Sequence, residues 1–113
     1  DRDPHKRPLM AAAAEALADR LVLTSDNPRS ESPTAILAQM CKGLARVQDA
    51  KVIEDRAAAI AQAVREASPA DVLLVAGKGH ETTQEIAGVF HPFSDVAQLQ
   101  QALAARAAQE VHA

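Results

Sequence analysis

Aromatic residues are almost absent from this sequence of 113 residues, which contains two phenylalanines and no tryptophan or tyrosine. A surface that stacks nucleic-acid bases on aromatic side chains is therefore unsupported. An excess of basic residues is lacking as well, because the formal net charge is −3. Since nucleic-acid-binding domains usually carry a basic face, no nucleic-acid partner is expected.

Cysteine occurs once, as Cys41, so no cysteine metal cluster can form. Cys41 falls on the apolar side of a predicted helix, where it is expected to be a small core residue in a reducing compartment. His5, His91 and His112 show no metal-ligand spacing, and no metal site is expected. An apolar run long enough to span a membrane and a signal peptide are also missing, which predicts a cytoplasmic protein with no membrane partner.

Large apolar residues are scarce too, because 48% of the sequence is apolar but about half of those residues are alanine. A chain of this length permits one domain with a modest core, and residues 1–113 are therefore expected to form a single domain. Alanine favours helices that lie close to a sheet. Because the chain begins at Asp1 rather than at a methionine, it is expected to be a piece of a longer polypeptide.

Periodic apolar residues that follow a proline or a capping residue predict helices. Four are expected: from Pro8 to about Arg20 with Met10, Ala13, Ala14 and Leu17 inward, from Pro33 to about Gly43 after the cap Ser32, from Asp55 to Ser68, and from Ser94 to a fraying tail at Arg106. A short helix is expected over 82–87. Continuous apolar runs predict strands at 21–24, 51–53, 71–76 and 89–90, of which 71–76 is the strongest. Because strands and helices alternate, the predicted class is α/β with a mainly parallel, doubly wound sheet.

Two polar segments directly follow predicted strands: residues 24–31, TSDNPRSE, and residues 76–81, AGKGHE. Right-handed crossovers place both segments at the same edge of a parallel sheet, where they are expected to share a crevice. Arg29 offers two parallel donors for a carboxylate or phosphate, while Asp26 and Glu81 offer negative charge for an ammonium. This combination suits a zwitterion. The alternative is that Asp26 only forms an Asx turn and that Arg29 and Glu31 are solvated loop charges.

Gly77, Lys78 and Gly79 follow a predicted strand but do not match a phosphate-binding loop. A Walker loop needs four residues before its Gly-Lys-Ser/Thr end, and a dinucleotide loop needs a third glycine where this chain has Thr82. The glycines instead permit a tight turn that exposes backbone amides and carbonyls to a ligand. His80 is either a base or, more simply, a structural or ligand-contacting residue.

The same segments resemble the carboxy-terminal domain of the Mur ligase family. The resemblance is carried by Asp26-Asn27-Pro28-Arg29 with Ser30-Glu31, by residues 77–81, and by the opening residues 1–3 with 6–10, and it extends through Ser94-Asp95. The four-residue Asp-Asn-Pro-Arg motif is highly specific, because relatives that add lysine carry a different residue at the arginine. For Arg2, Lys6 and Arg7, the alternative is a solvated helix start.

The resemblance implies a function. These ligases use ATP to join an amino acid to a cytoplasmic peptidoglycan precursor: the carboxylate of the nucleotide-peptide becomes an acyl phosphate, which the incoming amine attacks. The carboxy-terminal domain has a Rossmann-like fold and supplies the amino-acid site. Meso-diaminopimelate would be bound by the following groups: Arg29 and Arg2 on a carboxylate, Asp26 and Asn27 orienting it, and Glu81 with the Gly77 carbonyl on the far ammonium. Lys78 and His80 receive no individual role, and no catalytic residue is expected.

Much of such a ligase lies outside this sequence, including the strand before Asp1, which would leave the sheet truncated at its first strand. ATP and Mg²⁺ would be bound mainly by the family's central domain, and the UDP-MurNAc-dipeptide by the missing domains. The chain is therefore expected to be inactive alone. The alternatives are a free-standing α/β carboxylate-binding or interaction module, and a lysine-adding ligase or a relative of folylpolyglutamate synthetase, for which Arg29 would be unnecessary.

Overall fold

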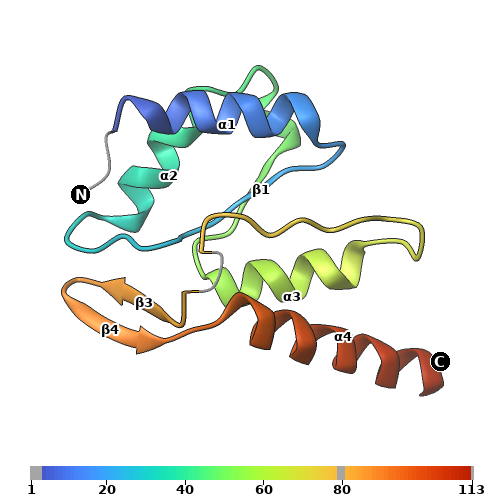
Figure 1. Ribbon diagram of the computed structural model, residues 1–113. Coiled ribbons are helices and arrows are strands. Elements are labelled where there is room, and N and C mark those ends of the chain that lie inside the picture. Colours follow the sequence, from blue (N-terminus) through green and yellow to red (C-terminus); the bar gives the residue numbers. More distant parts are fainter. Residues whose placement is uncertain (1–3, 79–80, 113) are drawn as a thin grey trace.

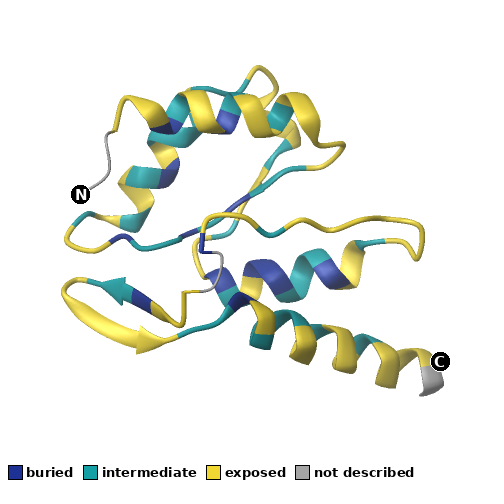
Figure 2. Ribbon diagram, in the orientation of Figure 1, coloured by how far each residue is buried: buried dark blue, intermediate teal, exposed yellow. Residues whose placement is uncertain are grey.

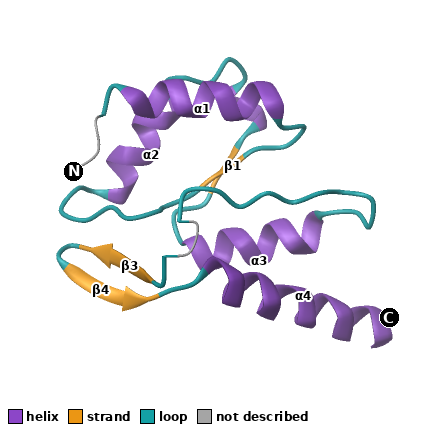
Figure 3. Cartoon of the chain, in the orientation of Figure 1, coloured by secondary structure: helices purple, strands orange, loops and turns teal. Residues whose placement is uncertain are grey.

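A computed structural model describes residues 4–78 and 81–112 of the chain. Helices and strands both occur (Figure 3), which confirms the α/β class. The helices are α1 (Lys6–Leu17), α2 (Pro33–Cys41), α3 (Arg56–Glu66) and α4 (Asp95–His112), with a short 3₁₀ helix η1 (Val47–Asp49). The strands are β1 (Val22–Leu23), β2 (Lys51–Val52), β3 (Thr83–Ile86) and β4 (Val89–Pro92).

Helices lie on both sides of a parallel pair of strands (Figure 1). In the β1–β2 pair, Val22 is opposite Lys51 and Leu23 is opposite Val52. Helices α1 and α2 pack against each other on one side, and α3 packs against α4 on the other. This layering agrees with the expected α/β arrangement, although the parallel sheet has two strands in the described part of the chain.

Three of the four predicted helix starts are confirmed by their caps, whereas α1 begins at Lys6 without a side-chain cap. Ser32 Oγ accepts a hydrogen bond from the Ala35 amide at 3.3 Å, and the Asp55 carboxylate accepts one from Ala58 at 3.3 Å. Ser94 Oγ accepts from the amide three residues later, also at 3.3 Å. Each cap satisfies an amide that has no partner within the helix.

Residues 71–76, the strongest predicted strand, pair with no strand in the described part of the chain, so this prediction is wrong. Val72 and Leu74 are 95% and 85% exposed, and Figure 2 shows most of the segment as exposed. Apolar, β-branched composition favours a strand only where a neighbouring strand supplies a hydrogen-bonding ladder. Such a neighbour is not found for 71–76 among residues 4–78 and 81–112.

The predicted helix over 82–87 is also wrong, because residues 83–86 form β3, which pairs antiparallel with β4. Ala87 and Gly88 join the two strands and both have positive φ, 52° and 79°. A two-residue turn with left-handed residues matches the twist of a hairpin, so it favours paired strands over a helix. The predicted strand at 89–90 is confirmed and continues to Pro92.

Helix α1 buries a different face from the predicted one. Leu17 is 91% exposed and Met10 is 55% exposed, whereas Arg7 and Ala11 are buried. The reason is a close backbone contact with Gly43, because a Cβ added at Gly43 would lie 1.9 Å from the Pro8 carbonyl oxygen. Only glycine permits this approach, and the approach determines which face of α1 turns inward.

The tail of α4 does not fray at Arg106, because the helix continues to His112. Arg106 Nη1 donates to the Val64 carbonyl at 2.7 Å, and its Nε donates to Glu110 at 3.0 Å. A cation at the carboxyl end of α3 satisfies a free carbonyl and interacts favourably with the helix dipole. This contact holds the tail against α3.

The core is small, as the composition predicts. Its buried apolar members are Ala11, Leu23, Leu37, Ala59, Ile60 and Val64. They come from α1, β1, α2 and α3, and Figure 2 shows dark-blue segments on each of these elements. Among the helices of the described residues, none is both long and apolar enough to cross a membrane.

Candidate functional site

Arg56, the first residue of α3, joins the two polar segments that follow β1 and residues 71–76. Its guanidinium donates to the Ser25 carbonyl and to the Ala76 carbonyl, each at 3.1 Å. The same group forms a two-pronged ion pair with Asp95 of α4, at 2.7 and 2.6 Å. Both side chains are buried. The two segments therefore lie together, as expected, although residues 71–76 are not a strand of the parallel sheet.

The β3 strand holds the first of these segments in place. Gln84 is buried, and its side-chain amide donates to the Asp26 carbonyl at 2.8 Å. The Glu85 amide donates to Asn27 Oδ1 at 2.9 Å. The Glu85 carbonyl in turn accepts from the Arg29 amide at 2.9 Å. The hairpin that sequence reasoning missed is thus the platform of the candidate site.

Arg29 has a left-handed backbone with φ of 58°. Its amide and its carbonyl both bond to the hairpin, the carbonyl accepting from Ala87 at 2.6 Å, so Arg29 pairs with Ile86 as an isolated bridge. A non-glycine residue in this region is strained and is held there only by its surroundings. The residue is exposed, and its side chain makes no hydrogen bond or ion pair with a described residue. Its guanidinium is available to a ligand.

Asn27 connects the two segments through its side chain. Its Nδ2 donates to Glu81 Oε2 at 3.1 Å, while its Oδ1 accepts from Lys78 Nζ at 3.3 Å. Lys78 Nζ also lies 3.6 Å from Asp26 Oδ1. Glu81 is exposed, whereas Lys78 is buried. The structure therefore brings Asp26, Asn27, Lys78 and Glu81 together, with Glu81 at the surface.

Gly77 lies against Asp26 and has a φ of 115°, which side chains rarely allow. A Cβ there would lie 3.2 Å from Asp26 Oδ2. The positive φ thus favours glycine, as its role in a tight turn predicts, and a Cβ would also crowd the Asp26 carboxylate.

Arg7 is not the solvated residue that the alternative interpretation expects. It is buried and donates two hydrogen bonds to the Glu31 carboxylate, both at 2.8 Å, and one to Gln39 at 2.7 Å. The hydrogen bond from Arg7 lowers the pKa of Glu31 below its ordinary value. This pair anchors the far end of the 24–31 segment to α1 and α2.

Two residues of the predicted site region, Arg2 and His80, lie outside the described residues. The roles predicted for Arg2, Asp26, Asn27, Arg29, Gly77 and Glu81 in binding a substrate stay predictions. Within residues 4–78 and 81–112, no three His, Cys, Asp or Glu side chains are grouped so that they could hold a metal ion.

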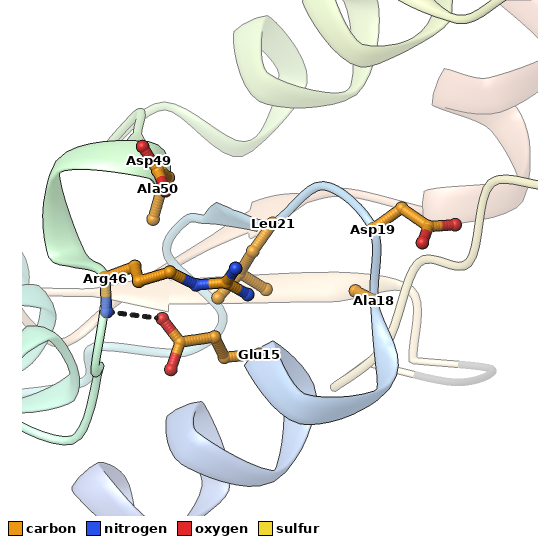
Figure 4. Close-up of a pocket in the computed structure, with 7 residues that line it drawn as sticks. All are labelled: Glu15, Ala18, Asp19, Leu21, Arg46, Asp49 and Ala50. Carbon is orange, nitrogen blue, oxygen red and sulfur yellow. Dashed lines mark hydrogen bonds between the residues drawn. The ribbon is translucent and has the colours of Figure 1, made fainter.

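A small hollow at the opposite end of β1 is not the site (Figure 4). It encloses about 30 Å³ and lies between Glu15, Leu21 and Arg46, with Ala18, Asp19, Asp49 and Ala50. This volume holds about one water molecule. Glu15 accepts hydrogen bonds there from the amides of Ala45 and Arg46, at 2.8 and 2.9 Å, and these bonds lower its pKa. Glu15 therefore stabilises the turn at Ala45 and Arg46.

Sequence reasoning missed Arg56, Gln84 and Asp95 as residues that shape the site. Gln84 and its hairpin were detectable, because Ala87-Gly88 separates two short runs that contain β-branched residues. Asp95 lies within the resemblance, but neither Asp95 nor Arg56 showed from the sequence which partner it would bind.

Comparison with known proteins identifies the family to which this chain is similar. The family described as "Mur ligase, glutamate ligase domain" matches residues 1–79. The chain is 60% identical over 106 residues to a protein of Ralstonia nicotianae, covering 94% of this chain and 21% of that protein. It is 53% identical to a Pseudomonas aeruginosa protein, covering 93% of this chain and 22% of that protein. Both are named UDP-N-acetylmuramoyl-L-alanyl-D-glutamate--2,6-diaminopimelate ligase.

A solved structure with the same ligase name agrees, with a TM-score of 0.88 and 45% identity over 94% of this chain and 22% of the other. The chain thus spans about a fifth of the length of the relatives it matches. Family match, sequence identity and fold agree, and the chain belongs to the Mur ligase family, in which it corresponds to the glutamate ligase domain.

Proposed function

We propose that this chain is the amino-acid-binding domain of an ATP-dependent ligase that adds meso-2,6-diaminopimelate to UDP-MurNAc-L-Ala-D-Glu in the synthesis of peptidoglycan precursors. The proposal is carried by two exposed groups of opposite charge, the Arg29 guanidinium and the Glu81 carboxylate, on two segments held together by buried contacts. It is supported by the names of the similar proteins in Ralstonia nicotianae and Pseudomonas aeruginosa.

The far end of diaminopimelate carries a carboxylate and an ammonium on one carbon. Arg29 would bind the carboxylate through two parallel hydrogen bonds, with Arg2 as a second cation. Glu81 and the Gly77 carbonyl would bind the ammonium. Asp26 and Asn27 would orient the bound amino acid, since both are already bonded to the hairpin or to the second segment.

ATP and Mg²⁺ are assigned to other parts of the full-length enzyme. The described residues do not fit a nucleotide phosphate site, because the ammonium of Lys78, which follows Gly77, is buried against protein acceptors. The UDP-MurNAc-dipeptide is likewise assigned to the remaining domains, and the enzyme to the cytoplasm, where this precursor is made. A doubly wound, mainly parallel sheet is proposed for the full-length protein.

The test compares Arg29→Ala with wild type in the full-length enzyme, using diaminopimelate and lysine, which lacks the far carboxylate. An unpaired carboxylate in the crevice costs roughly 2 to 5 kcal/mol. The kcat/KM for diaminopimelate should therefore fall about 30-fold or more, whereas that for lysine should change far less. Arg29→Lys should rescue only partly, because an ammonium lacks the planar pair of donors.

The matched control is Arg65→Ala, because Arg65 is an exposed arginine in the last turn of α3. This variant should keep wild-type kcat/KM for both amino acids. If Arg29→Ala loses both substrates equally, Arg29 supports the loop and does not recognise the carboxylate.

A further inference from the structure

The side chain of Lys78 is enclosed by the protein and is 0% exposed. Its ammonium donates to the Thr83 carbonyl at 2.7 Å and to Asn27 Oδ1 at 3.3 Å, and it lies 3.6 Å from Asp26 Oδ1. Two of the three donor hydrogens of the ammonium thus form hydrogen bonds, and the Asp26 carboxylate adds an ion pair. The charge of Lys78 is therefore directed at neighbouring protein groups and not at a ligand.

The surroundings of Lys78 determine the orientation of the Asn27 amide. Asn27 Oδ1 receives two donors, the Lys78 ammonium at 3.3 Å and the Glu85 amide at 2.9 Å. Only the oxygen of the amide can accept from both, so its nitrogen must point the other way. There it donates to Glu81 Oε2 at 3.1 Å. Lys78, Asn27 and Glu81 thus form a continuous chain of hydrogen bonds.

Burying an ammonium is costly, and an apolar side chain of similar volume would often stabilise a core at least as well. Here the cost is offset by Asp26 and by the ring of Phe93, whose centroid lies 5.9 Å from the ammonium. The partners of Lys78 come from separate parts of the chain, the loop after β1 and strand β3. A single cation therefore holds together the parts that present Glu81.

We propose that Lys78 is a positioning residue for amino-acid recognition: it orients the Asn27 amide, which in turn holds the Glu81 carboxylate toward the substrate ammonium. The inference rests on the proposed function and assigns to Lys78 a role without contact to the substrate.

The experiment uses the full-length ligase and the variant Lys78→Met, which keeps the length of the side chain and removes its donors. KM is measured for diaminopimelate, ATP and the UDP-MurNAc-dipeptide. The KM for diaminopimelate should rise about tenfold, the effect of a weakened hydrogen bond to a charged group, and the other two should stay at wild-type values. Lys42→Met is the control, because Lys42 is an exposed lysine just after α2.

Failure of the inference is separable from failure of the proposed function. A wild-type enzyme that does not ligate diaminopimelate would refute the proposed function. A wild-type enzyme that does, together with a Lys78→Met variant of unchanged KM for diaminopimelate, would overturn the role of Lys78 alone. A fall in kcat with unchanged KM for diaminopimelate would likewise overturn it, because that is the result of a merely structural residue.

Two further variants test the hydrogen-bond chain. If Lys78 acts through Glu81, the double variant Lys78→Met/Glu81→Gln should raise the KM for diaminopimelate little beyond the larger single effect, whereas independent effects would multiply to about 100-fold and overturn the chain. Lys78→Arg keeps a buried cation, so it is the variant to measure if Lys78→Met does not fold. Its planar guanidinium should displace Asn27 and raise the KM for diaminopimelate selectively, and a wild-type KM in this folded variant would also overturn the proposal.

Discussion

Replacing Arg56 with alanine removes the cation from the most deeply buried ion pair of the described chain. The side chains of Arg56 and Asp95 are 2% and 7% exposed, and two hydrogen bonds of 2.7 and 2.6 Å join them. The variant also releases the carbonyls of Ser25 and Ala76. It therefore leaves one buried carboxylate and two carbonyls without their donor.

Breaking a buried pair on one side costs about 3 to 5 kcal/mol, a large share of the roughly 5 to 15 kcal/mol by which a domain is stable. Urea denaturation of Arg56→Ala measures this loss directly. With a slope near 2 kcal/mol per molar urea, the midpoint should fall by about 2 M.

Two control variants show whether the effect of Arg56→Ala is specific to the buried ion pair. Lys51→Ala breaks the exposed pair with Glu66, whose side chains are 48% and 41% exposed, and should cost at most about 1 kcal/mol. The double variant Arg56→Met/Asp95→Leu removes both charges and should recover most of the stability. The reasoning is refuted if Arg56→Ala costs no more than Lys51→Ala, or if the double variant is no more stable than Arg56→Ala.

Three further predictions concern packing, pH and activity. Gly43→Ala should lower the free energy of unfolding more than Gly88→Ala in urea denaturation, because a methyl at 43 meets the Pro8 carbonyl at 1.9 Å, whereas one at 88 meets nothing within 4 Å; the reverse order would contradict this. The free energy of unfolding should fall as the pH drops from about 5 to about 3, because the pKa of Glu15 is lower in the folded chain than in the unfolded chain. The stabilisation by ionised Glu15 is present above the unfolded pKa and is lost as the pH falls through the folded pKa. Glu15→Gln should flatten this dependence in urea midpoints taken across the pH range, and an unchanged dependence would contradict the assignment. The 113-residue chain alone should neither hydrolyse ATP nor form a peptide bond in a phosphate-release assay, and turnover above the blank would count against a domain role.

The sequence predicts best what is decided locally. Ser32, Asp55 and Ser94 each bond to an amide three residues later, so the start of each helix is encoded within one turn. The polar segments at 24–31 and 76–81 were likewise readable, because their residue types are unusual directly after apolar runs. They meet in the structure through side-chain bonds of Arg56 and Asn27, and not as the ends of two parallel strands.

The errors concern contacts between distant residues. Residues 71–76 have strand composition but no strand partner in the described chain, and composition does not supply one. The inward face of α1 depends on Gly43, more than 30 positions from Pro8, and not on apolar periodicity. Arg56 was overlooked because its partners, Asp95 and two backbone carbonyls, are brought to it only by the fold.

The left-handed backbone at Arg29 sets stability against the proposed substrate recognition at a single position. An L-residue in this conformation costs roughly 1 to 2 kcal/mol, and glycine would adopt it almost freely. Stability alone would therefore not place an arginine here. A redesign of this protein that optimised only its folding free energy would favour glycine at position 29 and would discard the guanidinium proposed to bind the substrate.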